Sequence, residues 1–335
     1  MIKVGIIGYG YWGPNLLRNF MQLDIGTVGA VADPRQQRLN LVKIAYPTIK
    51  TYLNAVDLIA NNEIDAVVIA TPVFSHFELA RRALLSGKHV IIEKPMTSSA
   101  SEAQELIDIA LKKNLVLMVD HTFLYTGAVR KIQELIDTDT LGKLRYFDST
   151  RLNLGLFQPD VNVLWDLAPH DISILSFLVS EKPYSINATG TSHTLNGIEN
   201  IAYMTVNYAS DLIAHFHCSW TSPVKIRQTL IGGDAKMIVY NDLEPSEKVR
   251  IYDTGYTHQT EEDKTRIQVD YRTGDISIPK LQASEALRGV AMDFIESIIA
   301  GRQPISTALL GLDVIKILEA SQESIKNKGK EVKVK

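Results

Sequence analysis

The residues "IKVGIIGYGYWGP" (2–14) join an apolar run to a glycine-rich turn, and they decide the fold that we expect. The first six residues are typical of a buried strand, and Gly8, Gly10 and Gly13 follow in the pattern G-x-G-x-x-G. Pro14 stands in the first turn of the expected helix, where its missing N–H costs little. Glycines at this spacing allow a tight turn and let a pyrophosphate approach the helix N-terminus, so the stretch predicts a dinucleotide-binding loop.

An acidic residue closes the next apolar run. Asp33 lies 20 residues after Gly13, the position of an acid that hydrogen-bonds the ribose hydroxyls of adenosine. Its charge should repel a 2′-phosphate and favour NAD over NADP, whereas Arg35 could accept that phosphate. The alternative is a glycine turn with an unrelated surface aspartate. We predict NAD as the cofactor and NADP as the weaker choice, with loop contacts from Gly8, Tyr9, Gly10, Tyr11, Trp12 and Gly13.

The first part of the chain alternates apolar runs with amphipathic ones. We expect further strands at 27–33, 64–71, 88–94 and 115–121, and helices at 74–86 and 100–113. Ser99 and Glu102 have the spacing of a capping box at the start of the second helix. This alternation predicts an α/β fold, with a doubly wound parallel sheet in a Rossmann domain over residues 1–121.

The pattern changes in the remainder of the chain. Strands with partial alternation are expected at 143–152, 200–208 and 211–220, the last two as a hairpin, and helices at 170–179, 284–300 and 307–327. The basic tail is either a frayed end or a final strand. We predict an α+β domain over residues 122–335 with a largely antiparallel open sheet, used for substrate binding and oligomerisation.

Composition narrows the function classes. The chain of 335 residues carries a formal net charge of −3, which gives no support to binding of nucleic acid or an anionic membrane. No apolar run is long enough to span a bilayer, and glycines interrupt the N-terminal run too early for a signal peptide. The single cysteine, Cys218, cannot form an internal disulfide, which suits a reducing cytoplasm. We expect a cytoplasmic protein.

Two segments carry candidate chemistry. Lys94, in "EKP", ends a predicted strand at the sheet edge where ligands bind in open α/β sheets, with Glu93 beside it, and we expect both to contact the cofactor. In "WDLAPHD" (165–171), Asp166 and His170 lie four residues apart and share one face if 163–178 is helical. Pro169 could instead kink this helix or mark its start. A solvated lysine and a purely structural aspartate–histidine pair are the alternatives.

These segments resemble the Gfo/Idh/MocA oxidoreductases, a family that includes glucose–fructose oxidoreductase and inositol dehydrogenase. The resemblance covers essentially the whole chain: "VGIIGYGYWG" is similar to the family's dinucleotide loop, "EKP" to its signature lysine, and "GKLRYFDS" and "IGGDAKMIVYND" to its second domain. It implies that Lys94 stabilises an alkoxide-like charge. It also implies that Asp166 and His170 form the family's catalytic pair, with His170 as the acid/base and Asp166 orienting it.

Several other side chains are weaker candidates. Thr71 and Pro72 follow a predicted strand and are expected in the cofactor channel, with His76 one turn later as either a cofactor or a structural contact. Asp171 could steer substrate or cap the helix. For substrate binding we name His121, as the resemblance implies, and in addition Asn153, Trp165 and His170. His215 and His217 share one face of a strand but have no third ligand at a persuasive spacing, so we expect no metal site.

The resulting hypothesis is an NAD-dependent dehydrogenase that takes hydride from a secondary hydroxyl of a sugar, a cyclitol or a nucleotide-linked sugar. The polyhydroxylated substrate class is implied by the resemblance, and Trp165 departs from the commoner glycine-containing form of this segment. A non-catalytic NAD-binding redox sensor and an NAD-assisted glycoside-cleaving enzyme are the alternatives. Because one sheet face should stay uncovered, we expect a homo-oligomer, a dimer or a tetramer.

Overall fold

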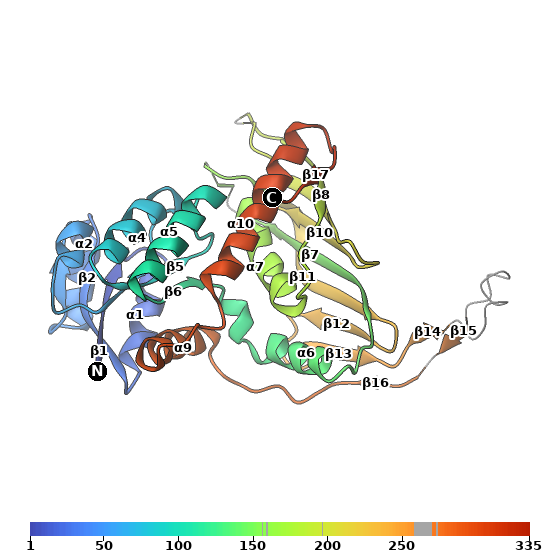
Figure 1. The fold of residues 1–335 in the computed structure, drawn as a ribbon, viewed down its shortest axis with the longest axis horizontal. Coiled ribbons are helices and arrows are strands. Elements are labelled where there is room, and N and C mark those ends of the chain that lie inside the picture. The colour runs from blue at the N-terminus through green and yellow to red at the C-terminus, as the bar shows by residue number, and fades with distance from the viewer. Residues whose placement is uncertain (156, 159, 196, 258–269, 273) are drawn as a thin grey trace. The chain divides into compact units, whose positions relative to one another are not determined.

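The computed structural model describes residues 1–155, 157–158, 160–195, 197–257, 270–272 and 274–335 (Figure 1). Two compact units divide the chain. The first contains Met1–Thr126 and Ser284–Lys316, and the second contains Gly127–Ala283 and Ile317–Lys335. The first unit thus includes a late segment of the chain, while the functional division after residue 121 stays a prediction.

A parallel six-stranded sheet forms the core of the first unit, with strand order β3-β2-β1-β4-β5-β6. Its strands are β1 (Ile2–Ile7), β2 (Gly26–Ala32), β3 (Lys50–Tyr52), β4 (Ala66–Ile69), β5 (His89–Glu93) and β6 (Leu117–Asp120). This is the doubly wound order that the sequence predicts. Only β3 was not predicted, because three residues are too few to show a pattern.

The helices of the first unit are α1 (Gly13–Met21), α2 (Gln36–Ala45), α3 (Ala55–Ile59), α4 (His76–Leu85), α5 (Ala100–Lys113), α9 (Ala286–Ala300) and the first part of α10 (Ala308–Lys326). Short 3₁₀ turns lie at η1 (Val73–Ser75) and η2 (Thr122–Tyr125). The α5 helix has its predicted bounds. The Ser99 hydroxyl accepts a hydrogen bond from the Glu102 amide at 3.3 Å, and the Glu102 carboxylate accepts one from the Ser98 amide at 3.1 Å. In a complete capping box the Glu102 carboxylate would accept from the amide of Ser99, whereas here it accepts from the amide of Ser98.

A nine-stranded sheet forms the core of the second unit, with order β16-β13-β12-β11-β7-β10-β9-β8-β17. Its strands are β7 (Leu144–Leu154), β8 (Ser185–Thr191), β9 (Ile201–Asn207), β10 (Ile213–Ser219), β11 (Thr221–Gly233), β12 (Met237–Asn241), β13 (Val249–Tyr252), β16 (Ile276–Ser277) and β17 (Val332–Lys333), with a separate ribbon of β14 (Gly255–Thr257) and β15 (Asp270–Arg272). Every neighbouring pair except β7 and β10 is antiparallel, so the prediction of a largely antiparallel open sheet is confirmed. The tail forms the final strand, β17, which pairs with β8.

Helix α6 (Gly127–Asp137), helix α7 (Val163–Leu178) and the end of α10 belong to this unit. The prediction that the helix before β8 begins at residue 170 was wrong: it begins seven residues earlier, at Val163, where Asn162 caps it, so the alternative range 163–178 is the observed one. The Asn162 side chain accepts hydrogen bonds from the amides of Leu164 and Trp165 at 3.1 and 3.2 Å. Pro169 cannot donate to the Trp165 carbonyl, yet it lies inside the helix, whose buried residues hold it in place. Among the described residues, no helix is both long and apolar enough to cross a membrane.

Candidate active site

The glycine loop joins β1 to α1 in the first unit. Gly8 has φ +98°, and a Cβ there would overlap the carbonyl oxygen of Ala70. A Cβ on Gly13 would lie 2.5 Å from the Gly8 carbonyl oxygen, so both glycines are required by the folding of the loop itself. Gly10 differs, because a Cβ there would meet only the Arg35 guanidinium, at 3.8 Å. The bare backbone at Gly10 therefore leaves open surface beside the start of α1, where a pyrophosphate fits.

Asp33 lies buried at the end of β2 and accepts four hydrogen bonds. The Tyr9 amide and the Arg35 Nη2 donate to Oδ2, both at 2.8 Å. The Arg35 amide and Nε donate to Oδ1 at 3.0 and 2.8 Å. Burial raises the pKa of Asp33, but the bonds from Arg35 and Tyr9 outweigh it, and the pKa lies below its usual value. Asp33 is thus a fixed carboxylate partly neutralised by Arg35.

A cavity of about 420 Å³ opens beside this carboxylate. Gly8, Asp33, Pro34, Asn54, Thr71 and Leu79 contribute to its wall. Its size lies within the range of small-molecule pockets, roughly 300–1,000 Å³. With apolar walls, one fixed carboxylate and the open glycine loop, these residues fit the adenosine and pyrophosphate parts of a dinucleotide.

Thr71, Pro72 and His76 lie between β4 and α4. The Thr71 hydroxyl accepts a hydrogen bond from Ser75 at 2.8 Å. The buried ring of His76 places Nε2 2.8 Å from the Thr71 carbonyl oxygen and Nδ1 2.9 Å from that of Pro95, and burial lowers the pKa of His76. His76 therefore connects the end of β4 to the "EKP" turn, and its direct contact with a cofactor stays a prediction.

Four polar side chains gather at the carboxyl ends of β5 and β6. Glu93 and Asp120 are paired in register across the two strands, and Lys94 and His121 follow them. Burial, and then the charge of Lys94, lower the pKa of His121 to about 3. The His121 ring is therefore neutral near pH 7, and its two buried nitrogens have no hydrogen-bond partner among the described residues. A neutral imidazole can both donate to and accept from a hydroxyl group, so His121 suits recognition of an alcohol.

Asp120 is a member of this cluster that the sequence did not single out. It is buried, and its Oδ1 accepts a hydrogen bond from the Thr122 hydroxyl at 2.7 Å. Burial raises the pKa of Asp120 to about 6. The pKa of Glu93 is also raised, first by burial and then by the charge of Asp120. The position of Asp120 directly before His121 was a usable signal, because consecutive residues at a strand end border the same sheet edge.

Replacing Asp120 with asparagine is expected to raise the free energy of unfolding at pH 7.5. The pKa of this carboxyl is about 6 in the folded protein, against an ordinary value of 3.8. Between these pH values the folded protein therefore holds a proton that the unfolded chain has lost. The parent therefore loses stability as pH rises from about 4 to about 6, and the variant lacks this part of the loss, about 1–3 kcal/mol. Urea unfolding at pH 4 and 7.5 measures the difference, with the exposed Asp108→Asn as the control. An equal effect at both pH values would contradict the assignment.

The second candidate set lies on α7 in the second unit. Asp166 and His170 are four residues apart on this continuous helix, which places them on one face as the sequence predicts. Asp166 Oδ2 accepts a hydrogen bond from the indole Nε1 of Trp220 at 2.9 Å. The carbonyl of His170 accepts one from the Ser173 hydroxyl at 2.7 Å. The pairing of Asp166 with His170 stays a prediction.

Asp171 has a structural partner. Arg151, on β7, donates from Nε and Nη2 to its two carboxylate oxygens, both at 2.7 Å, and both side chains are buried. This bidentate ion pair joins α7 to the sheet directly beside His170. Sequence reasoning missed Arg151, although an arginine on the buried face of an alternating strand signals a charged partner.

For the remaining candidates of the second unit, the structure gives a position but no contact that assigns a role. Asn153, on β7, and Trp165, on α7, are half-buried, and their contact with substrate stays a prediction. His217 stacks on Tyr203 with 4.4 Å between the ring centroids, and His215 Nδ1 lies 3.3 Å from Asp148. No group of three or more metal-ligating side chains occurs in the part of the chain that the structure describes. The subunit contact expected on this sheet face stays a prediction.

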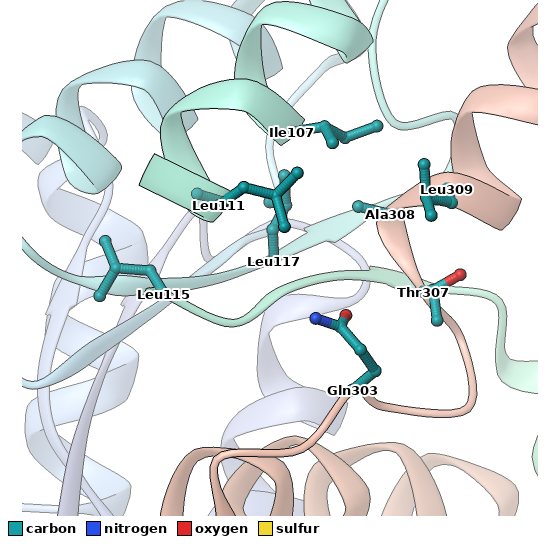
Figure 2. A pocket seen from close by; sticks show the side chains of 9 residues that line it. Ile107, Leu111, Leu115, Leu117, Gln303, Thr307, Ala308 and Leu309 are labelled. Carbon is teal, nitrogen blue, oxygen red and sulfur yellow. The ribbon is translucent and has the colours of Figure 1, made fainter. Parts of the chain in front are cut away.

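A second hollow of the first unit has a volume of about 180 Å³. Figure 2 shows the side chains that line it. Its wall comes from α5, β6 and the start of α10 together with the turn before it, and Ile107, Leu111, Leu117 and Leu309 are among its residues. This wall is mostly aliphatic, with Gln303 and Thr307 as its polar side chains, and none of the residues that line it carries a titratable group. It therefore offers no acid–base chemistry comparable to that of the two sets above.

Comparison with known proteins identifies the family. Residues 2–121 match the family described as an oxidoreductase family with an NAD-binding Rossmann fold, GFO_IDH_MocA, and residues 129–239 match the GFO/IDH/MocA C-terminal domain. The chain belongs to the GFO/IDH/MocA family. The first match contains the glycine loop, Asp33, Lys94 and His121, and the second contains the candidate residues of α7.

Similar family members act on different substrates. UDP-N-acetylglucosamine 3-dehydrogenase of Acidithiobacillus ferrooxidans is 29% identical over segments covering 62% of this chain and 64% of that enzyme. The NADP(+)-dependent scyllo-inositol 2-dehydrogenase IolW of Bacillus subtilis is 25% identical, over 98% of this chain and 94% of that enzyme. For several curated relatives, the chain spans only about half of their length.

A solved structure shows the same fold. The oxidoreductase from Agrobacterium radiobacter in complex with NAD+, L-tartaric acid and magnesium has a TM-score of 0.84 at 20% identity, covering 99% of this chain and 98% of that one. The GFO/IDH/MocA architecture of a Rossmann unit and an open-sheet unit is therefore shared over the whole length.

Proposed function

We propose that the chain is an NAD-dependent dehydrogenase that oxidises a secondary hydroxyl group of a sugar, a cyclitol or a nucleotide-linked sugar. One observation carries the proposal: a chain with an open glycine loop and a fixed Asp33 also presents Asp166, hydrogen-bonded by Trp220, four residues before His170. A protein that only senses NAD would need the glycine loop and Asp33, but it would not need Asp166 and His170.

The bound nicotinamide supplies the hydride acceptor, and the side chains of this protein handle the proton and the charge. His170 accepts the proton of the hydroxyl group, since an imidazole beside a carboxylate is suited to general acid–base catalysis. Asp166 orients the ring and stabilises its protonated form. Lys94 stabilises the negative charge that develops on the oxygen, and the neutral His121 hydrogen-bonds a substrate hydroxyl group.

Asp33 and Arg35 set the cofactor preference. Asp33 can accept from the ribose hydroxyl groups and repels a 2′-phosphate. Arg35 uses Nε and Nη2 on Asp33, so its guanidinium is already engaged and is less suited to receive the phosphate. We propose that NAD is preferred to NADP.

A hydride-transfer screen tests the function. Reduction of NAD+ and NADP+ is followed by absorbance with free sugars, cyclitols and UDP-sugars as substrates. We expect reduction of NAD+ by at least one polyhydroxylated compound, and a higher kcat/KM with NAD+ than with NADP+. A preference for NADP+ would show that Arg35 dominates over Asp33. Product formation with no net reduction of the dinucleotide would instead indicate glycoside cleavage with a recycled cofactor.

A further inference from the structure

Trp220 connects the sheet of the second unit to α7, the helix that carries Asp166 and His170. It lies between β10 and β11 and is 1% exposed, among the most buried large side chains of the protein. Its amide donates to the Asn200 carbonyl at 2.9 Å, and its carbonyl accepts from the Gly155 amide at 3.1 Å. Backbone bonds on both sides and complete burial of the ring therefore fix the direction of the indole N–H.

That N–H points at one oxygen of Asp166, with Nε1 2.9 Å from Oδ2. Indole is a donor only and does not titrate near neutral pH, so it can hold a carboxylate without exchanging a proton with it. A hydrogen bond to a charged acceptor is stronger than one between neutral groups, and it restricts rotation of the carboxylate about χ2. His170 lies one turn further along the same helix, so the orientation that this bond gives to the Asp166 carboxylate bears on how the carboxylate meets the imidazole.

We propose that Trp220 is a positioning residue, which holds the Asp166 carboxylate in the orientation that pairs with His170. This inference rests on the proposed dehydrogenase function. Trp220 touches neither substrate nor cofactor in this scheme and acts only through Asp166. Its effect should therefore be seen in the acid–base step and should disappear when Asp166 can no longer carry charge.

The test compares two variants that change the same aromatic cluster differently. Trp220→Phe keeps a buried ring and removes the N–H donor. Phe157→Leu removes the ring that meets Trp220 edge-on, with 5.5 Å between the centroids, and keeps the donor. We expect Trp220→Phe to lower kcat by about 10- to 100-fold, the effect of losing a hydrogen bond to a charged group, and Phe157→Leu to lower it by less than about 3-fold.

The pH profile and a double-variant cycle separate positioning from packing. In Trp220→Phe the acidic limb of the pH profile of kcat should move to lower pH. The reason is that the His170 imidazole loses part of the stabilisation of its charged form. In an Asp166→Asn background, Trp220→Phe should have little further effect on kcat. Full additivity of the two substitutions, or an unchanged pH profile, would overturn the inference. The affinity for NAD+ should not change, since the loop and Asp33 belong to the first unit.

An NMR measurement on the intact protein covers the case in which Trp220→Phe does not fold. The indole N–H resonance of Trp220 should shift on Asp166→Asn, while that of the partly exposed Trp12 should not. An unchanged Trp220 resonance overturns the contact itself. If the parent protein turns over none of the substrates in the screen, the dehydrogenase proposal and this inference fail together. If the parent is active and Trp220→Phe equals it, only the positioning role fails.

Discussion

Replacing His170 with asparagine is expected to lower kcat by about 10²- to 10⁴-fold, the usual contribution of a positioned general acid or base. Asparagine retains polarity and roughly the size of the ring but cannot accept the proton of the hydroxyl group. Binding of NAD+ should be unchanged, because the candidate cofactor residues Gly8–Gly13 and Asp33 lie in the other compact unit. Steady-state kinetics and titration of NAD+ by intrinsic fluorescence measure the two quantities.

His215→Asn is the matched control for this experiment. His215 is a half-exposed histidine on β10, and its contacts are with Asp148 and the ring of Tyr203. Its replacement should leave kcat within about 2-fold of the parent, since surface substitutions away from a site have small effects. Equal kcat values for the parent and His170→Asn would remove His170 from the mechanism.

Replacing Arg151 with methionine is expected to lower the free energy of unfolding by about 3–5 kcal/mol. The Arg151 and Asp171 side chains are 5% and 4% exposed, so the variant leaves the Asp171 carboxylate buried without its cation. The double variant Arg151→Met, Asp171→Leu removes both charges and should recover most of the loss, because a buried pair of similar volume can be replaced by apolar side chains. Urea denaturation measures all three proteins.

Arg145→Met is the control for the second prediction. Arg145 lies on the same strand and pairs with Asp234, but the two side chains are 29% and 35% exposed. Solvent screens such a pair, so its loss should cost no more than about 1 kcal/mol. If Arg151→Met were no worse than Arg145→Met, the buried pair would not be the main link between α7 and the sheet.

Local patterns predicted most elements of the first unit, although helices α2 and α3 were not expected. Apolar runs marked five of the six strands, because a parallel sheet covered on both faces needs uninterrupted apolar sequence. For α7 the sequence left two ranges open, 170–179 and 163–178, because Pro169 could either mark the start of the helix or lie inside it, and the second range is the observed one. The N-cap Asn162, which sets the start, was not singled out. The assignment of Ser284–Lys316 to the first unit depends on contacts distant in sequence and has no local signature.

The sequence predicted the positions of the candidate acid–base residues and not of the residues that contact them. Spacing alone placed Asp166 and His170 on one helix face, since four residues complete about one turn. Trp220 lies 54 residues from Asp166, and Arg151 lies 20 from Asp171. Those pairings follow from the register of β7, β10 and β11, which the sequence does not specify at the level of single residues. Pairs of this kind become visible only when the sheet is assembled.

The late segment of the first unit affects how that unit is made during translation. Phe20 on α1 meets Phe294 on α9 edge-on at 6.3 Å, and Glu285 binds Arg18 and Asn19. The ribosome must therefore synthesise the whole open-sheet portion before α9 can pack on α1. Until then the face of α1 that meets α9 stays bare, which is the kind of nascent intermediate that chaperones bind. A fragment ending near residue 121 would retain that exposed face permanently and should aggregate on expression.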